Sequence, residues 1–447
     1  MYQDSPILAD LSPVQGRRVQ AAFDGGMISS NGGLLLLREV ERGMGIAHRL
    51  AACIADRRQA SKVSHRYDDM IRFRSLLIAA GYDDADDCDH LRHDPVLKMA
   101  ADRLPGTGEA LCSQPTMSRL ENTPSRMTLC RMMAAMVEVF CDSWRHVPAR
   151  IVLDFDDTED RVHGNQQLAL FNAHYGSYCF LPMHIFEAAS GKPVASILRP
   201  GKTPSGKEVA TIVKHVVGRI RRHWPRVKIL IRGDGHYAGP EVMDWCESND
   251  VSYIFGLTGN AVLHEAVAAM VEDVAVRRAG KDGTVKLRRH AAFAYAAKTW
   301  SRQRTVIGRI EASAMGTDRR YVVTNLIGRP KHLYEKVYCA RGQAENLIKA
   351  HKLHLASDRT SCHSATANQF RLILHSAAYW LMHGLRQRAP RKSFWRTAQF
   401  DTIRSRLIKL AARVTEMNTR IKVSLPTACP ERAIITFLAA RIGAQGP

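Results

Sequence analysis

The sequence predicts an α/β protein in which a mixed β-sheet covered by helices follows a helical N-terminal region and precedes a basic C-terminal tail. Short apolar runs and helical patterns alternate between residues 151 and 257 in the order strand, strand, strand, helix, strand, helix, strand. This order is typical of a sheet with helices packed on it. Hydrophobic residues make up 45% of the 447 residues and charged residues 24%, which excludes a wholly disordered or fibrous chain.

Residues 1–148 are expected to form the helical N-terminal domain. Apolar residues recur at helical spacing from Gly33 and again from Tyr67. Within this domain, SQPTMSRLEN (113–122) is either an ordinary helix of the bundle or the recognition helix of a helix-turn-helix, with Arg119 facing DNA bases.

Residues 149–259 carry the alternating elements of the sheet. Apolar runs predict strands at residues 151–156, 178–186, 193–199, 227–232 and 251–257. Helical periodicity predicts helices at residues 206–224 and 239–250. Ser205 is a possible N-cap of the first helix, because a side-chain oxygen at that position accepts a hydrogen bond from the first turn.

Two further regions lead to the tail. Strand-like runs at residues 305–314 and 321–325 predict a β-rich insertion over residues 260–330. A long helical pattern begins near Tyr338 and recurs from about residue 367, so residues 331–385 are expected to be helical.

Positive charge dominates the chain and is concentrated in its tail, residues 386–447, which we expect to be helical. Lys and Arg number 64 against 43 Asp and Glu, a net charge of +21. The tail alone has thirteen Lys and Arg against three acids, a net charge of +10. Such an excess predicts a polyanionic partner, with nucleic acid as the first candidate and an acidic membrane surface as the second.

The remaining composition argues against a secreted or membrane protein. The ten cysteines are dispersed without a CxxC pair, which favours isolated thiols in a reducing cytosol over zinc sites or disulfides. The N-terminal residues show no signal-peptide pattern, and no apolar run approaches the roughly 20 residues that span a bilayer. We therefore expect a cytoplasmic protein with no membrane partner.

Three acidic residues occupy positions suited to chemistry. Asp156 closes the first predicted strand, Asp234 follows the fourth, and Glu345 lies in the helical pattern that begins near Tyr338. Open α/β sheets bind ligands outside the C-terminal ends of their strands, where the first two acids lie. Carboxylates that converge there repel one another without a cation, and Mg²⁺ satisfies that need while leaving positions for phosphate oxygens.

The pattern around Glu345 predicts a polar stripe beside an apolar one. At about 100° per residue, Tyr338, Arg341, Glu345 and Lys352 fall between roughly 300° and 360° around the helix. The adjacent face, at roughly 180–280°, carries the apolar residues Ala344, Leu347, Ile348 and Leu355 and suits packing on a sheet. An exposed helix with random polar residues would fit the pattern equally well.

The spacing Tyr338-x2-Arg341-x3-Glu345-x6-Lys352 resembles the Tyr-Arg-Glu-Lys signature of bacterial insertion-sequence transposases of the DDE type. With segments 81–95 and 113–122, which look typical of one branch of these proteins, the resemblance spans roughly residues 25–385. Any single motif is weak evidence for the family. Four motifs that occur in order, each in the expected strand or helix context, are specific evidence.

The two aspartate motifs also resemble those of the family. Asp156-Asp157-Thr158 resembles its Asp-x-Thr, and Asp234 resembles its second Asp. The following His236-Tyr237 is a departure from the family's pattern, from which we expect no catalytic consequence.

The resemblance implies an RNase H-like catalytic core. Its first part would be residues 149–259, its last part residues 331–385 with the Glu345 helix, and residues 260–330 would be the inserted β-rich domain. Residues 1–148 would serve DNA binding and dimerisation, and residues 386–447 would form a basic helical C-terminal region.

The resemblance also implies a catalytic, metal-binding triad of Asp156, Asp234 and Glu345. Asp154 and Asp157 compete with Asp156 for the first position, and strand parity does not separate Asp154 from Asp156 because both point to the same face. The spacing to Thr158 and the place at the strand end favour Asp156. The triad would bind two Mg²⁺ ions, with Mn²⁺ able to substitute.

Five residues are expected to contact DNA. By resemblance, Tyr338, Arg341 and Lys352 would contact phosphates near the cleaved bond. Trp300 lies where related transposases use an aromatic residue to stack an extruded base, although a buried core tryptophan is at least as good a reading. Arg119 is the base-reading candidate in the N-terminal helices.

These expectations describe a DDE transposase that moves an insertion sequence by cut and paste. It would cleave double-stranded DNA at terminal inverted repeats, join the 3′-OH to target DNA, act as a homodimer in the synaptic complex and be associated with the bacterial nucleoid. The alternatives are a metal-dependent nuclease of the same fold without strand transfer and a catalytically inactive DNA-binding regulator.

Overall fold

The computed structural model describes residues 11–279 and 285–443. The chain divides into two units, one made of residues 124–376 and the other of residues 1–123 together with 377–447. The acids expected at the catalytic site all belong to the first of these units.

The unit of residues 124–376 contains a central sheet, its covering helices and a small second sheet. Its strands are β4 (Arg150–Asp157), β5 (Asp160–Arg161), β6 (Leu170–Asn172), β7 (Ser177–Phe180), β8 (Met183–Glu187), β9 (Lys192–Ile197), β10 (Lys228–Gly233), β11 (Val251–Leu257), β12 (Leu287–Tyr295), β13 (Arg304–Ser313) and β14 (Gly316–Thr324). Its helices are α7 (Arg126–Asp142), α8 (Gly206–His223), η2 (Gly235–Tyr237), α9 (Pro240–Ser248), α10 (Ala261–Ala266), α11 (Ala268–Ala279), α12 (Pro330–His332), η3 (Leu333–Tyr338), η4 (Cys339–Gly342), α13 (Gln343–Lys352) and the first part of α14 (Ala365–Arg388).

The central sheet has eight strands in the order β12-β13-β14-β11-β10-β4-β8-β9. Strands β4, β10 and β11 are parallel neighbours, and the other pairs are antiparallel. The strands predicted at residues 151–156, 193–199, 227–232 and 251–257 are confirmed as β4, β9, β10 and β11. A mixed α/β fold with one large sheet is therefore confirmed.

The predicted strand at residues 178–186 is two strands that belong to different sheets. β7 ends at Phe180 and pairs with β5 and β6, whereas β8 begins at Met183 and pairs with β4 and β9. Pro182 lies between them and has no N–H to donate to a neighbouring strand, so the apolar run does not continue as one strand.

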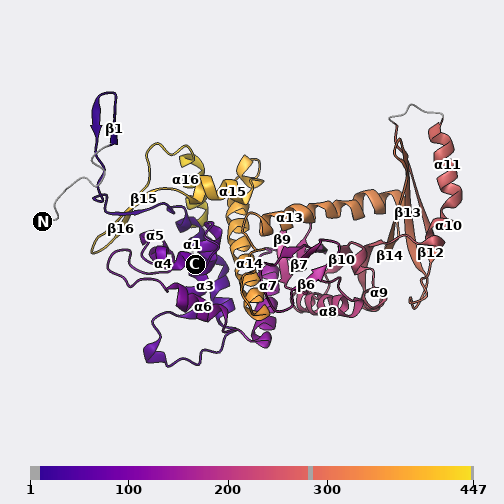
Figure 1. Cartoon of the computed structure of the whole chain (residues 1–447), viewed down its shortest axis with the longest axis horizontal. Coiled ribbons are helices and arrows are strands. Elements are labelled where there is room, and N and C mark those ends of the chain that lie inside the picture. The colour runs from indigo at the N-terminus through magenta and orange to yellow at the C-terminus, as the bar shows by residue number, and fades with distance from the viewer. Residues whose placement is uncertain (1–10, 280–284, 444–447) are drawn as a thin grey trace. The chain divides into compact units, whose positions relative to one another are not determined.

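Residues 260–330 extend the central sheet. After α10 and α11, the strands β12, β13 and β14 form an antiparallel group, and β14 pairs with β11 so that Tyr321 lies opposite Leu257. The inserted strands thereby continue the hydrogen bonding of the sheet beyond β11. Figure 1 shows α11 lying along the long strands β12 and β13.

The two faces of the central sheet are covered by different helices. Successive side chains of a strand point to opposite faces. On one face Leu333 and Tyr334 pack against Leu230, Ile254 and Ile307 in a buried cluster. The helices α8 and α9 pack together on the other side of the sheet (Figure 1).

The helices predicted at residues 206–224 and 239–250 are confirmed as α8 and α9. The Oγ of Ser205 accepts a hydrogen bond from the backbone N–H of Glu208 at 3.2 Å, so the predicted N-cap is confirmed as well. The cap satisfies one of the N–H groups that the first turn of a helix leaves without an intrahelical partner.

The helical pattern around Glu345 is not a regular α-helix, so the predicted angular positions do not apply throughout. η3 is a π-helical turn, η4 is a 3₁₀ turn, and regular α-helix starts only with α13 at Gln343. The change in pitch alters the angle per residue between Tyr338 and Glu345. Within α13 and just beyond it, Ala344, Ile348 and Leu355 are buried as predicted.

The unit of residues 1–123 and 377–447 is mainly helical but also contains strands. Its N-terminal elements are β1 (Leu11–Val14), β2 (Arg17–Val19), β3 (Met27–Ser29), α1 (Leu34–Met44), α2 (Ile46–Ala51), η1 (Ala60–Lys62), α3 (Tyr67–Ala79), α4 (Asp87–Leu91), α5 (Pro95–Ala100) and α6 (Gln114–Glu121). Its C-terminal elements, after the end of α14, are η5 (Phe394–Arg396), α15 (Phe400–Ile403), η6 (Arg404–Ile408), β15 (Ala412–Glu416), β16 (Ile421–Ser424) and α16 (Arg432–Gly443).

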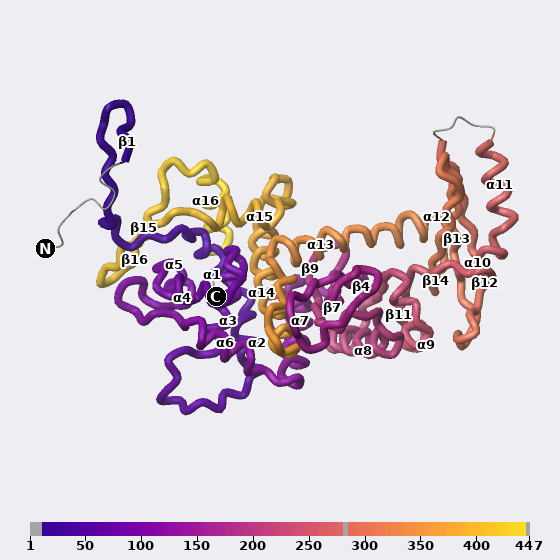
Figure 2. Tube along the Cα trace, in the orientation of Figure 1, coloured from indigo at the N-terminus to yellow at the C-terminus, as the bar shows by residue number. Residues whose placement is uncertain are grey.

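The basic tail differs from the helical region predicted for it, because β15 and β16 form an antiparallel hairpin. β15 also pairs with β3, matching Ala412 to Ser29, so the tail completes a three-stranded sheet with N-terminal residues. Figure 2 shows the tail, in yellow, returning to the indigo N-terminal segment. Among the described helices, none combines the length and apolar character needed to cross a bilayer.

Candidate active site

The C-terminal ends of β4 and β10 lie at one edge of the central sheet, and acidic residues gather there. The two strands run parallel and pair Asp154 with Arg232. Two residues after this pair, each strand leads to an acid. Asp156 lies on β4, and Asp234 lies just beyond the end of β10. The fold thus brings together the first two acids that the sequence singled out.

Asp157, Asp234 and His236 form the tightest group at this edge. One potential ligand atom from each lies within 4.8 Å of the others. The Nδ1 of His236 lies 3.3 Å from the Oδ2 of Asp157 and 3.9 Å from the Oδ2 of Asp234. Asp234 also accepts a hydrogen bond from the backbone N–H of His236 at 2.9 Å, which fixes the short turn η2. The hydrogen bond to Asp157 raises the pKa of His236.

Asp156 lies beside this group and faces a cation. The Nη1 of Arg341 is 3.1 Å from the Oδ2 of Asp156, and both side chains are largely buried. Burial, which outweighs the attraction of Arg341, raises the pKa of Asp156 to about 6, and the negative charges of Asp234 and Asp157 act in the same direction. A carboxyl group with a raised pKa among like charges is typical of a functional site.

Asp154 does not belong to the carboxylate group at the strand ends. It is fully buried, and both of its oxygens accept hydrogen bonds from Arg232. Of the two alternatives to Asp156, Asp157 therefore lies among the candidate ligands and Asp154 does not.

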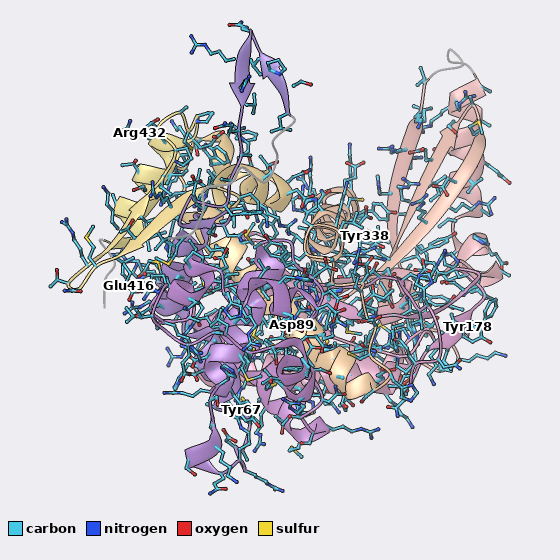
Figure 3. The ribbon with its side chains drawn as sticks, turned by 60° about the vertical axis from the view of Figure 1, so that its left-hand side comes forward. Tyr67, Asp89, Tyr178, Tyr338, Glu416 and Arg432 are labelled. Carbon is cyan, nitrogen blue, oxygen red and sulfur yellow. The ribbon has the colours of Figure 1, made fainter. Side chains whose placement is uncertain are left out.

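A pocket of about 260 Å³ opens at Gly235, the residue that follows Asp234. Its lining residues are Gly235, Gly256, Leu257, Thr258, Arg319, Arg320, Tyr321, Tyr334 and Tyr338. Figure 3 labels Tyr338 on the helical segment beside the long strands. Burial raises the pKa of the Tyr338 hydroxyl, so it remains a hydrogen-bond donor at neutral pH. Guanidinium groups and aromatic rings together suit a phosphate and an unstacked base.

Glu345 lies outside the group of converging ligands. It is exposed on α13, a helix that packs on β4 and β8 and whose adjacent face is buried through Ala344 and Ile348. Among residues 11–279 and 285–443, the group with three mutually close ligand atoms consists of Asp157, Asp234 and His236 and does not include Glu345. The structure therefore brings two of the three predicted acids together and leaves the third on a neighbouring helix.

Lys352 contacts the loop that follows the first acidic motif. Its Nζ donates to the backbone carbonyl of Glu159 and lies 3.9 Å from the Oδ1 of Asp160. Asp160 is buried, so the lysine charge offsets a carboxylate held away from water.

Trp300 lies at the opposite end of the sheet from the acids. It is in the loop between β12 and β13, edge-on to Tyr295, with the guanidinium of Arg304 5.4 Å from its ring. Arg304 pairs with Glu247 of α9, just before β11 begins. Asp234, in contrast, follows the C-terminal end of the parallel strand β10.

Arg119 is exposed on α6 in the other unit. Its Nη2 donates to the Oγ1 of Thr116 at 2.8 Å. The side chain is therefore accessible to solvent, and the helix predicted for residues 113–122 is confirmed.

Sequence reasoning missed four residues near this site, and His236 most clearly, because the structure places it beside Asp157 and Asp234. The available signal was its place two residues after Asp234 in the turn that ends a strand. Arg319, Arg320 and Tyr334 gave no comparable signal, because the pairing of β14 with β11 and the packing of η3 bring them to the pocket.

The donor set fits a divalent cation. Asp157 and Asp234, with Asp156 beside them, offer carboxylate oxygens, which hard cations such as Mg²⁺ prefer, and His236 adds an imidazole nitrogen, which Mn²⁺ accepts more readily. Three acids this close repel one another, and Arg341 offsets the charge of Asp156.

Comparison with known proteins gives the following matches. A family model described as "Transposase DDE domain group 1" matches residues 11–446. Similar solved structures include a piggyBac transposase synaptic complex with hairpin DNA, at 10% identity and a TM-score of 0.42 over 85% of this chain and 80% of that one. A Mos1 transposase paired-end complex matches at 12% identity and a TM-score of 0.18 over 51% of this chain and 75% of that one. No curated protein matches. Since the family model covers nearly the whole sequence, the chain belongs to the DDE transposase family, domain group 1.

Proposed function

We propose that this transposase moves an insertion sequence by cut and paste, cleaving DNA at terminal inverted repeats and joining the freed 3′-OH to a target strand. The observation that carries the proposal is the group of Asp157, Asp234 and His236 at the ends of two parallel strands, with Asp156 beside the group and Arg341 against Asp156. Cleavage and joining are both phosphoryl transfers, and carboxylates that hold divalent cations serve both.

Some residues of the site would hold cations, and others would hold DNA. Asp156, Asp157 and Asp234, joined by Glu345 from α13, would hold the cations. When bound, divalent cations lower the pKa of an attacking water or hydroxyl and stabilise charge on the phosphate. Asp157 would orient His236, because its carboxylate lies within hydrogen-bonding distance of the Nδ1.

DNA would be held by Arg341 and by residues that line the pocket at Gly235. Arg341 can present two N–H donors to one phosphate, which suits it for the backbone beside the cleaved bond. Tyr338, Arg319 and Arg320 line the pocket next to Gly235 and would hold the adjoining nucleotide. This assignment replaces Trp300, which lies at the far end of the sheet. Joining two transposon ends would require at least a dimer.

An assay with labelled end DNA and an unlabelled target plasmid, with Mg²⁺ or with EDTA, tests the proposal. We expect cleaved ends and joined products in Mg²⁺ and neither in EDTA. Cleavage without joining would replace the proposal with the nuclease alternative, and end binding without cleavage would favour an inactive regulator.

The role of Glu345 needs a separate variant because the residue lies outside the ligand group. We expect Glu345→Gln to lower cleavage by at least about 100-fold, the order seen when a group that stabilises transition-state charge is removed. Affinity for end DNA, measured by fluorescence anisotropy, should stay within about twofold of wild type. Glu272→Gln removes a similarly exposed acid from α11 and is the matched control. An equal loss of binding and cleavage would show that Glu345 is structural.

A further inference from the structure

The first acid of β4 makes a buried ion pair that the proposed chemistry does not use. Asp154 and Arg232 are register partners on adjacent parallel strands, 0% and 5% exposed. The Nε of Arg232 donates to Oδ1 at 2.6 Å and its Nη2 donates to Oδ2 at 2.7 Å. This bidentate geometry fixes the plane of the guanidinium as well as its position.

The third nitrogen of the same guanidinium reaches the helical segment above the sheet. The Nη1 of Arg232 donates to the backbone carbonyl of Val337 at 2.7 Å. Val337 lies in the π-helical turn η3, two residues before the chain tightens into the 3₁₀ turn η4 at Cys339. At such a change of pitch the backbone no longer follows the i to i−4 pattern, and an external donor can hold a carbonyl there.

The residues that follow Val337 are those assigned to DNA. Tyr338 lines the pocket beside Gly235, and Arg341 contacts Asp156. Leu333 and Tyr334 attach the segment to the sheet by apolar packing. Because apolar packing is not directional, it does not by itself set the rotation of the segment or its shift along its axis.

We propose that Arg232, held by Asp154, is a positioning residue that sets the register of residues 333–342 and so directs Tyr338 and Arg341 to the active site. The hydrogen bond to Val337 anchors the segment at one backbone atom, and the ion pair anchors the guanidinium to β4. The strands β4 and β10 thus carry the acids at their ends and, through the ion pair, also orient Tyr338 and Arg341. The expected effect on DNA cleavage rests on the proposed function. The anchoring of residues 333–342 by Arg232 does not depend on it.

Replacing both members of the pair provides the sharpest test. Removing one partner leaves a buried charge and can unfold the protein, whereas an apolar pair of similar volume is often neutral for stability. We therefore choose Asp154→Leu with Arg232→Met. The matched control is Arg199→Met with Glu208→Leu, which replaces another ion pair of the same unit, in which Arg199 is 1% exposed and also donates to a backbone carbonyl. That pair makes no hydrogen bond to residues 333–342 in the described structure.

Three measurements are expected to separate positioning from stability. The first is hydrogen–deuterium exchange of the peptide containing residues 333–343, which should become faster in the Asp154→Leu, Arg232→Met protein and not in the control. The second is Mn²⁺ affinity, which should fall less than turnover does, because Asp156, Asp157 and Asp234 remain. The third is the turnover of saturating end DNA, which should fall by roughly 100-fold, as expected for a displacement of about 1 Å. The unfolding midpoint should match that of the control.

Arg232→Lys adds a conservative variant that keeps the positive charge but cannot make all three contacts. We expect it to show the same faster exchange and reduced turnover, with the unfolding midpoint retained. Exchange of residues 333–343 at the wild-type rate in the double variant would overturn the proposal, and so would wild-type turnover. If the wild-type protein cleaves no DNA, the proposed function fails, and the exchange measurement still decides whether Arg232 positions the segment.

Discussion

At the scale of single residues, the site is surrounded by polar groups that are buried and satisfied by one another. His184 lies opposite Asp156 in the pairing of β8 with β4, and its Nδ1 is 3.0 Å from the hydroxyl of Ser196. Its ring centroid is 4.8 Å from that of His351, which is bonded to two further serine hydroxyls. Such a network stabilises the fold only while the rings are neutral.

Acid is therefore expected to weaken the fold through these histidines. Burial lowers the pKa of His184 from its ordinary 6.5 to about 4 and also lowers the pKa of His351 well below its ordinary value. Between pH 6.5 and 4 the unfolded chain binds more protons than the folded one, so stability falls as the pH falls. Each buried histidine should contribute about 1.4 kcal/mol per pH unit in this window.

Urea unfolding between pH 7.5 and 5 checks this expectation. His184→Gln should show a shallower loss of stability with acid than wild type, because glutamine does not titrate. His215→Gln, which changes an exposed histidine of α8, should keep the wild-type slope. Parallel slopes for all three proteins would contradict the assignment.

A second residue-scale prediction concerns the close approach of backbone and Tyr338 at Gly256. A Cβ at this position would lie 2.8 Å from the Tyr338 hydroxyl and 3.0 Å from the backbone nitrogen of Gly235. Gly256→Ala should therefore displace the pocket wall and lower DNA cleavage at least tenfold. Gly218→Ala is the control, since nothing lies within 4 Å of the position that a Cβ would take there; in the middle of α8 it should raise stability by about 0.5–1 kcal/mol. Cleavage by Gly256→Ala at the wild-type rate would show that the pocket wall tolerates the methyl group.

At the scale of elements, the long strands and helices follow from local signals, but the segment from Leu333 to Gly342 does not. α8 has a regular apolar face and a capping serine, and the sequence predicts it within one or two residues. The π-helical and 3₁₀ turns before α13 depend on packing against the sheet and on the contact of Arg232 with Val337. Irregular turns of this kind often occur at functional sites.

The cap of α8 gives a prediction at this scale. Ser205→Ala should lower the free energy of unfolding by about 1 kcal/mol, because the N–H of Glu208 loses its acceptor. Ser205→Asp keeps an acceptor and should retain most of the stability. Urea unfolding of the three proteins measures the difference, and equal stability of the alanine and aspartate variants would rule out a capping role.

At the scale of the whole molecule, charge determines the kind of partner. The net charge of +21 is far from neutral, and the tail carries several exposed cations on its β-hairpin, among them Arg413, Arg420 and Lys422. Figure 3 labels Glu416 at the end of the first strand of this hairpin, where its carboxylate accepts from the backbone of Gly106. The tail has many more basic than acidic residues, and this excess suits a polyanion such as DNA.

Binding of end DNA should weaken steeply with salt, because each neutralised phosphate releases a counterion. We expect Arg420→Gln with Lys422→Gln to reduce the slope of log affinity against log salt concentration by roughly two. Lys207→Gln with Lys214→Gln lowers the net charge equally on the exposed side of α8 and should change the slope less. Equal slopes for the two double variants, measured by fluorescence anisotropy, would remove the hairpin from the interface.

The sequence by itself determined the order of strands and helices around Asp156 and Asp234. Apolar periodicity and turn residues are local, so they are readable without a structure, and acids that directly follow two apolar strands gather once the strands are parallel neighbours. The charge balance likewise indicated a polyanionic partner before any fold was known.

Only the tertiary structure decided which groups surround those acids. It buried Asp154 against Arg232, brought His236 to Asp157, assembled a pocket from β14 and η3, and left Glu345 and Trp300 away from the ligand group. These outcomes depend on contacts between residues tens of positions apart along the chain. A periodic pattern reports which face of an element is apolar, but it does not report which element will pack against that face.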